Sequence, residues 1–257
     1  MSAPVPVGLE LWTVRTDFNR DVFPTLTAVA RLGYEAVEFY STYLDWTVEF
    51  AESVRAHLDG LQLACASTHN GMRAFTPDAL ARTVELNQAL GSRLAVVASI
   101  PPVGTLDEWK AAADRFTGVA DALRPHGIAA GFHNHQREWT PLEGERPMDV
   151  IAAGTPSDFV LQFDVAPAVA TGSDPVEWIR ANPGRIRSVH CRDWGRANGS
   201  NLTFGEGDSP WPEIFAAAEG VGGVECYLIE HGHAEPDQEW RTAEQGLANW
   251  RVLRRLS

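Results

Sequence analysis

Four short apolar runs in this chain end in side chains that bind divalent metal: GIAAGFHNH at residues 127–135, FVLQFD at 159–164, RIRSVH at 185–190 and ECYLIE at 225–230. A carboxylate or imidazole at the end of a hydrophobic strand is costly to remove from water unless something pairs with it. The ends lie roughly 30 residues apart, so they can meet only where parallel strands bring their tips together. This pattern predicts the C-terminal rim of a (β/α)8 TIM barrel.

Strand-like and helix-like segments alternate along the whole chain. The helical patterns are Pro24–Leu32, Pro77–Leu90 with Thr76 as its expected N-cap, Leu106–Leu123, a short Pro147–Ala153, and Trp211–Ala218. No glycine-rich phosphate loop follows the first strand, which favours a closed barrel over an open sheet. We therefore expect one α/β domain over residues 1–257. Its eight expected strands, each short and apolar, are Val7–Leu11, Ala36–Phe39, Leu61–Ala66, Leu94–Ala98, Ile128–Phe132, Phe159–Phe163, Ile186–Val189 and Cys226–Ile229.

Charge and composition narrow the classes of partner. The formal net charge of −13 argues against nucleic acid, whose binding depends on Lys and Arg. The N-terminal segment lacks the basic and apolar regions of a signal peptide, and no apolar run is long enough to cross a membrane. Three cysteines without a CxxC pattern indicate reduced, buried thiols. We expect a cytoplasmic protein without nucleic-acid or membrane partners, and its oligomeric state stays open.

Metal-binding side chains are concentrated at the expected strand tips. Six of the eight histidines fall there, and the exceptions are His57 and His126 in helical ends. His133 and His135 can share one strand face because side chains alternate. A set of Asp164, His190, Glu230 and His133 suits Mn²⁺, Co²⁺, Zn²⁺ or Mg²⁺, and the lack of thiolates argues against a structural zinc site. Trp12 fits a sugar platform or rim packing equally well, and Glu38 fits a site residue or an ion-pair partner.

Several segments together carry a family resemblance: VGLELWTVR at 7–15, LGYEAVEF at 32–39, HNHQREW at 133–139, QFD at 162–164, VHCRD at 189–193 and FGEGD at 204–208. The chain resembles the sugar phosphate isomerase/epimerase family with its xylose isomerase-like barrel, in the branch with the HNHxxEF signature. The resemblance implies a divalent metal on His133, Asp164, His190 and Glu230, with His133 where the family usually has glutamate. That departure resembles inosose dehydratase. Endonuclease IV, of the same fold class, has a richer ligand set and a basic surface.

The resemblance also implies roles for the remaining rim residues. Glu230, His135 and Glu138 are the expected acid/base groups. The activity expected first is an isomerase or epimerase of a small sugar, keto-sugar or polyol derivative, acting through an enediolate. A lyase or dehydratase of an inosose-like substrate is the second hypothesis, and a non-catalytic sugar-binding barrel is the third. The residues expected to bind this small-molecule substrate are Trp12, Glu38, His69, Arg192 and Arg196.

Overall fold

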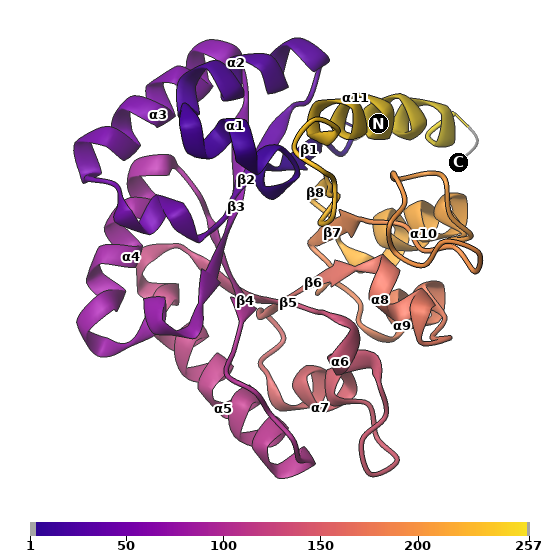
Figure 1. Cartoon of the computed structure of the whole chain (residues 1–257). Helices are drawn as coiled ribbons and strands as arrows, with labels where there is room; N and C mark the ends of the chain where they lie inside the picture. The colour runs from indigo at the N-terminus through magenta and orange to yellow at the C-terminus, as the bar shows by residue number, and fades with distance from the viewer. Residues whose placement is uncertain (1–3, 256–257) are drawn as a thin grey trace.

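Eight parallel strands form a closed barrel in sequence order, each hydrogen-bonded to the next and β8 to β1 (Figure 1). The computed structural model describes residues 4–255. The (β/α)8 TIM barrel predicted from the strand ends is confirmed. The strands are β1 (Val7–Glu10), β2 (Ala36–Phe39), β3 (Ala64–Gly71), β4 (Leu94–Ser99), β5 (Ala129–His133), β6 (Val160–Asp164), β7 (Ser188–Cys191) and β8 (Cys226–Ile229).

Most of the strands are buried on both faces, which explains their continuous apolar sequences; β3 is the exception. Every residue of β1, β2, β6, β7 and β8 is buried. Inside the barrel, Gly8 lies so close to the neighbouring strand that a Cβ there would be 2.9 Å from the carbonyl oxygen of Ala36. A side chain at Gly8 would therefore displace backbone. The polar residues at the strand ends lie above this packed interior.

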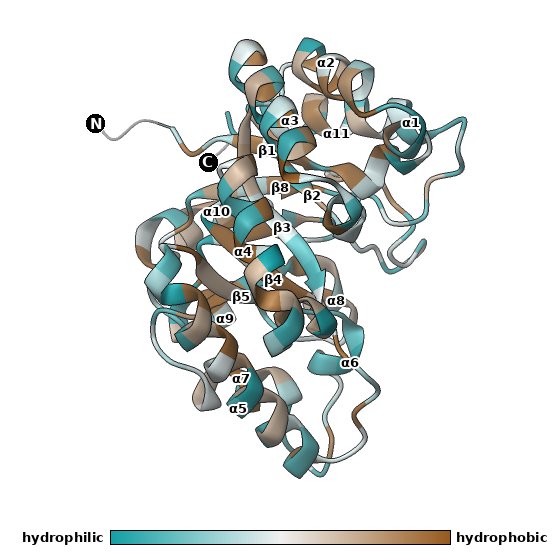
Figure 2. Cartoon of the chain, turned by 90° about the vertical axis from the view of Figure 1, so that its left-hand side faces the viewer, coloured by the Kyte–Doolittle hydropathy of each residue, from teal (hydrophilic) through white to brown (hydrophobic). Residues whose placement is uncertain are grey.

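Helices surround the barrel, and Figure 2 shows hydrophobic and hydrophilic colours on the same helices, as expected where one side packs on strands. Helix α5 begins with a capping box, in which Thr105 Oγ1 accepts from the Glu108 backbone and the Glu108 carboxylate accepts from Thr105 N. The helices are α1 (Arg15–Arg20), α2 (Val22–Leu32), α3 (Val48–Leu61), α4 (Pro77–Leu90), α5 (Leu106–Leu123), α6 (Gln136–Trp139), α7 (Pro147–Gly154), α8 (Val165–Ala170), α9 (Pro175–Ala181), α10 (Trp211–Ala217) and α11 (Glu239–Leu253).

Several expected strand boundaries are wrong, and the third strand differs most. The third strand begins at Ala64 because Leu61 still belongs to α3 and Gln62 ends that helix in the left-handed conformation, with φ of 58°. The first strand ends at Glu10, and Leu11 begins a short 3-10 helix. The third strand also continues to Gly71, beyond its expected end at Ala66, so His69 lies within it. Thr76 holds the N-cap position of α4, but its hydroxyl donates to Arg73 O instead of capping the helix.

The three cysteines are free thiols, as predicted. Cys191 and Cys226 are buried, whereas Cys65 is only partly covered. Among the helices of residues 4–255, none has the length and apolar character needed to span a membrane.

Candidate metal centre and active-site pocket

The C-terminal ends of seven strands bring ionisable side chains together at one end of the barrel. They come from strands far apart in sequence, and most are almost completely buried, whereas His69 and Glu230 are partly exposed. Closure of the barrel explains their meeting, because parallel strands end at the same rim. The residues are Glu10 on β1, Glu38 on β2, His69 on β3, His133 on β5, Asp164 on β6, His190 on β7 and Glu230 just after β8.

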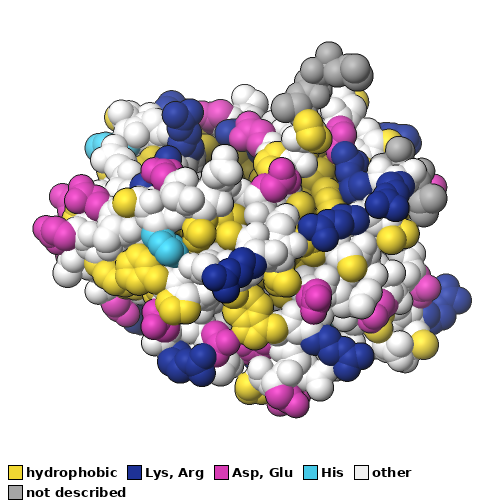
Figure 3. All heavy atoms as spheres, turned by 90° about the horizontal axis from the view of Figure 1, so that it is seen from above, with side chains coloured by type: hydrophobic (Ala, Val, Ile, Leu, Met, Phe, Trp, Pro, Cys, Tyr) yellow, Lys and Arg dark blue, Asp and Glu magenta, His cyan; other side chains and the backbone are white. Residues whose placement is uncertain are grey.

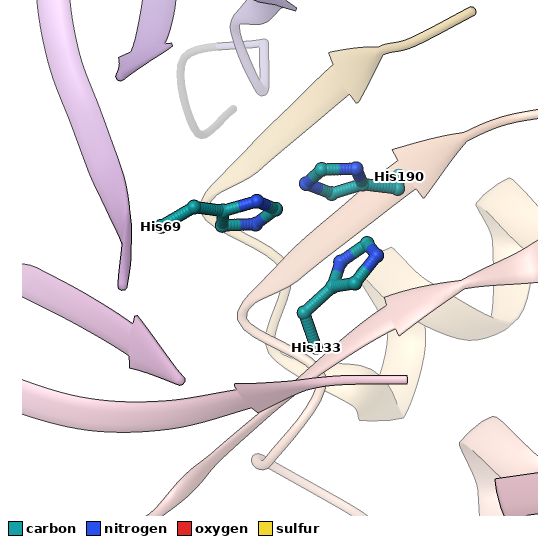
Figure 4. A group of neighbouring side chains, drawn as sticks. All are labelled: His69, His133 and His190. Carbon is teal, nitrogen blue, oxygen red and sulfur yellow. The ribbon is translucent and has the colours of Figure 1, made fainter. Parts of the chain in front are cut away.

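Three imidazole rings face one another near the barrel axis (Figure 4). The ring centroids of His133 and His190 are 4.5 Å apart, and His69 stacks on His190 at 5.1 Å with an interplanar angle of 7°. The three nitrogens that face one another lie within 4.8 Å. Burying three imidazoles side by side is unfavourable unless each has a polar partner, and neighbouring polar side chains supply those partners.

The predicted metal ligands meet in this cluster. His133, Asp164 and Glu230 offer ligand atoms within 4.8 Å of one another, so they can share one ion. His190, the fourth predicted ligand, contacts Glu230 through Nδ1 at 2.7 Å from Oε2. Within residues 4–255, His190 Nε2 is buried without a well-aligned hydrogen-bond partner. This mixture of imidazole and carboxylate donors fits a divalent transition metal or Mg²⁺.

Gln162 on β6 orients two of the histidines. Its amide oxygen lies 2.6 Å from His69 Nε2 and 3.0 Å from His133 Nδ1. An amide oxygen only accepts, so Nδ1 of His133 carries the proton and Nε2 keeps its lone pair. His133 Nε2 lies 3.8 Å from Asp164 Oδ2. A ligating histidine commonly has this arrangement, with one nitrogen fixed by a second residue.

Arg192 supplies a positive charge beside two predicted ligands. Its Nη1 donates to Asp164 Oδ2 at 2.6 Å, and its Nε lies 3.8 Å from Glu230 Oε1. Burial raises the pKa of Asp164 to about 6, although Arg192 opposes this rise. Burial also acts to raise the pKa of Glu230, but Arg192 and His190 outweigh it and lower that pKa to about 2.

Glu38 lies beneath the pocket and contacts histidines. Its Oε1 lies 2.7 Å from His190 Nε2 and 2.9 Å from His69 Nε2, while Oε2 accepts from Gln162 Nε2 and Ser67 Oγ. Burial disfavours its charge, yet His69 and His190 lower the pKa of Glu38 well below its usual range. Burial likewise opposes protonation of His190, but Glu38 and Glu230 raise its pKa. Of the two interpretations of Glu38, the geometry favours the ion-pair partner.

A pocket of about 750 Å³ opens above the cluster. It has the size of a small-molecule site. Of the predicted substrate-binding residues, Trp12, His69 and Arg192 line it. Trp12 is 42% exposed, and its ring meets Tyr40 edge-on at 5.3 Å. The lining residues are Glu10, Trp12, Tyr40, Ser41, His69, Asn70, Gly71, Ala98, Ser99, His133, His135, Arg192, Glu230, Gly232 and His233.

Comparison with known proteins identifies the family. The family model described as Xylose isomerase-like TIM barrel matches residues 26–251. The chain belongs to this family. Its fold is similar to that of a sugar phosphate isomerase/epimerase from Parabacteroides distasonis, with a TM-score of 0.78, 20% identity, and coverage of 96% of this chain and 93% of that one. A D-psicose 3-epimerase from Clostridium cellulolyticum, solved with D-tagatose, gives a TM-score of 0.74 at 15% identity, covering 96% and 99%.

A curated relative matches a shorter part of the chain. The rhizopine catabolism protein MocC of Rhizobium meliloti is 30% identical over 87 residues, which is 34% of this chain and 26% of that protein. The match therefore spans about a quarter of that relative. At these identities the solved structures establish the fold alone, and the HNHxxEF branch stays a prediction.

Arg196 and Glu138, two predicted site residues of this xylose isomerase-like barrel, lie outside both the pocket lining and the buried cluster of ionisable side chains. Arg196 is exposed on the loop after β7, where its backbone N–H donates to Asp208 Oδ2 at 2.8 Å. Glu138 is buried at the start of α6, and its carboxylate accepts from His135 N at 2.7 Å and from Arg137 Nε at 2.6 Å. Burial raises the pKa of Glu138, against the effect of Arg137. The carboxylate therefore caps α6 beside the site.

His135 also lines the pocket, but it is the N-cap residue of α6 beyond the end of β5 at His133, so strand alternation does not place it there. Its ring lies 5.0 Å from that of His133. Burial lowers the pKa of His135 to about 4, so the imidazole is neutral at pH 7. A neutral imidazole can accept a proton, which keeps His135 a candidate acid/base group.

Glu10 is a buried carboxylate of the pocket that sequence reasoning missed. It is 1% exposed, its Oε2 accepts from Trp12 N at 2.9 Å, and its Oε1 has no hydrogen-bond partner within residues 4–255. Burial, then Glu230 and Glu38, raise the pKa of Glu10 well above its usual value. The signal was present, because Glu10 ends the first apolar run just as Asp164 ends the sixth. Extending the first strand to Leu11 hid it.

Proposed function

We propose that this barrel is a divalent-metal-dependent isomerase or epimerase of a small sugar, keto-sugar or polyol derivative. The observation that carries the proposal is the convergence of His133, Asp164 and Glu230 ligand atoms within 4.8 Å at the base of a pocket of about 750 Å³. A metal centre open to a pocket on one side is the arrangement of a catalytic site rather than a structural one.

His133, Asp164, His190 and Glu230 would hold the ion, Mn²⁺, Co²⁺, Mg²⁺ or Zn²⁺. When bound, such an ion polarises a carbonyl and makes the neighbouring carbon-bound proton more acidic. Arg192 would remain beside Asp164 and Glu230 and could turn one N–H toward a substrate oxygen. His69 and Trp12 would orient the hydroxyl groups and the apolar face of the sugar.

Proton transfer is assigned to Glu230 and His135. Glu230 is ionised at neutral pH because Arg192 and His190 stabilise its charge, so it can take the proton from the carbon next to the carbonyl. The electron pair left on that carbon forms the enediolate. Returning the proton to the adjacent carbon gives isomerisation, whereas returning one to the opposite face of the same carbon gives epimerisation. Neutral His135 lies within the same pocket to serve the second transfer.

A lyase or dehydratase is the second candidate, and the neutral imidazoles favour it. His133 and His135 stand side by side, and burial lowers the pKa of each. One of them could take the proton from the carbon and become an imidazolium. That imidazolium could then give the same proton to the departing β-hydroxyl, so that water leaves and a double bond remains. A purely sugar-binding barrel is the third candidate, and it would bind without exchanging any proton.

Two experiments test the proposal. Elemental analysis of purified protein should show one divalent metal that is lost in Asp164→Ala, His190→Ala and Glu230→Ala; undiminished metal in all three would rule the site out. A panel of keto-sugars and inososes incubated in D₂O then separates the chemistries. Deuterium in an intact sugar supports isomerisation or epimerisation, an unsaturated product supports elimination, and binding without exchange supports the non-catalytic barrel.

We also expect no nucleic-acid substrate. On the face shown in Figure 3, Lys and Arg side chains are interspersed with Asp and Glu, and the net charge is −13. Binding to an abasic-site duplex at physiological salt should be negligible, and tight, salt-sensitive binding would overturn this expectation.

A further inference from the structure

We infer that the substrate of this pocket is uncharged: a free keto-sugar or polyol-type ketone without a phosphate or carboxylate group. The inference rests on the proposed function and narrows it. The pocket has one lining guanidinium, Arg192, among the residues that the structure describes, and that group is paired with Asp164 and lies near Glu230. A phosphate dianion beside Glu10 and Glu230 would find no unpaired guanidinium or ammonium group in the lining.

Arg15 and Arg137, two other arginines near the rim, have partners outside the pocket. Arg15 donates to the carbonyls of Trp12 and Ala234, and its Nη1 lies 3.4 Å from Glu239. Arg137 pairs with Glu138, and Arg196 lines a separate depression together with Asp208. To reach a ligand in the pocket, Arg15 or Arg137 would have to give up an existing ion pair.

The loop after β7 also disfavours the binding of an anion, for a different reason. Many barrels hold phosphate on the loops that follow strands seven and eight. Here the carboxylate of Asp193 occupies the glycine-rich turn, where Oδ2 accepts from Gly205 N at 3.0 Å, Gly207 N at 3.1 Å and Trp211 Nε1 at 3.0 Å. The N–H groups that could cradle a phosphate are therefore already used by a buried anion of the chain itself.

The pocket instead offers groups that suit neutral polyols. Trp12 and Tyr40 present aromatic surface, which packs on the C–H face of a sugar ring. Ser41 and Ser99 add neutral donors and acceptors for hydroxyl groups. The paired Arg192 can release one donor to a carbonyl or hydroxyl without facing a second charge.

The test compares free compounds with their phosphates on Mn²⁺-loaded protein, using calorimetry and the quenching of tryptophan fluorescence. The pairs are D-fructose, D-tagatose, D-psicose and myo-inositol, each with its monophosphate. Wherever a pair binds, the free member should bind at least about tenfold more tightly, since the phosphate brings a buried charge without a partner. A phosphate that binds more tightly than its free sugar would overturn the inference and leave the proposed function intact.

A positively charged side chain introduced into the pocket tests the electrostatic explanation of the preference for free sugars over phosphates. Ser99→Arg places a guanidinium in the pocket wall, whereas Ser53→Arg places one on the exposed surface of α3 as the matched control. Ser99→Arg should reduce or reverse the preference for the free sugar, and Ser53→Arg should not. An unchanged preference in Ser99→Arg would overturn the electrostatic explanation. If no compound of either kind binds and none exchanges deuterium, the proposed function itself fails.

Discussion

Glu10 and Glu230 stand at the same level on neighbouring strands, yet their surroundings are opposite. β1 pairs with β8 so that Leu9 lies across from Ile229, and each glutamate follows directly. Glu230 contacts His190 at 2.7 Å and lies 3.8 Å from Arg192, and its pKa falls to about 2. Glu10 caps a backbone N–H, has no cationic contact among the described residues, and has a raised pKa. Neighbouring charge, rather than burial, therefore decides which carboxylate is ready to act as a base.

Removing Arg192 should have the largest effect on the difference in pKa between Glu10 and Glu230. In metal-free Arg192→Met, the carboxylates of Asp164 and Glu230 lose their cation, and the free energy of unfolding at pH 8 should fall by about 3–5 kcal/mol. The loss should shrink as pH falls, because both pKa values rise in the variant and protonation then relieves the buried charge. Mn²⁺ should bind at least as tightly as to wild type, since no guanidinium competes for Asp164.

Denaturant unfolding at pH 8 and pH 5, with Mn²⁺ calorimetry, measures these effects. Arg187→Met is the matched control, because Arg187 pairs with Glu225 on the surface. That pair should contribute at most about 1 kcal/mol. Equal losses in the two variants would show that Arg192 has no special role in the site.

The second largest expected effect is on catalysis, where replacing Glu230 and replacing Glu10 should have different consequences. Glu230→Gln keeps the shape of the side chain but removes a base and a negative ligand, so activity should fall by at least about 10²-fold. Glu10→Gln should cost about tenfold or less, because an amide can replace a protonated carboxyl as a hydrogen-bonding group. Wild-type turnover by Glu230→Gln on a confirmed substrate would refute its acid/base role.

Metal binding should depend on pH through Asp164. Its pKa of about 6 means that a proton competes with the metal below that pH. As pH falls, Mn²⁺ affinity should weaken by about tenfold for each pH unit where His190, whose pKa is raised, binds a proton, and more steeply below about 6, where Asp164 also binds one. Calorimetry between pH 5 and pH 8 measures this. In Arg192→Met the pH at which the Asp164 proton begins to weaken Mn²⁺ binding should rise, because Asp164 loses its guanidinium partner. If that pH does not change, Asp164 is not the group at which the proton competes with the metal.

Glu138 should give the smallest effect. Its carboxylate caps α6, so Glu138→Gln should lower the free energy of unfolding by about 1 kcal/mol and leave activity within about tenfold of wild type. Turnover and unfolding measured on the same preparations decide this. If the variant instead lost activity by about a hundredfold or more while its stability stayed the same, the predicted catalytic role of Glu138 would be restored.

Local sequence was enough to predict most of the fold. Apolar runs of strand length, a proline at the start of α4 and glycine after its end fixed the positions of that helix and several strands to within a residue or two. The third strand was misplaced because the left-handed turn at Gln62 carries no sequence signal comparable to glycine. The reduced cysteines also followed from sequence.

The sequence by itself determined the barrel and the candidate ligands His133, Asp164, His190 and Glu230, because a polar residue that ends a buried strand is a local pattern. Only the tertiary structure decided how these side chains are paired. Arg192 reaches Asp164 across 28 residues, and Glu38 reaches His190 across the barrel. Such contacts set the pKa of each group and decide which hydrogen-bond donors stay free. They depend on which strands lie close together in space, and the local pattern of the sequence does not contain that information.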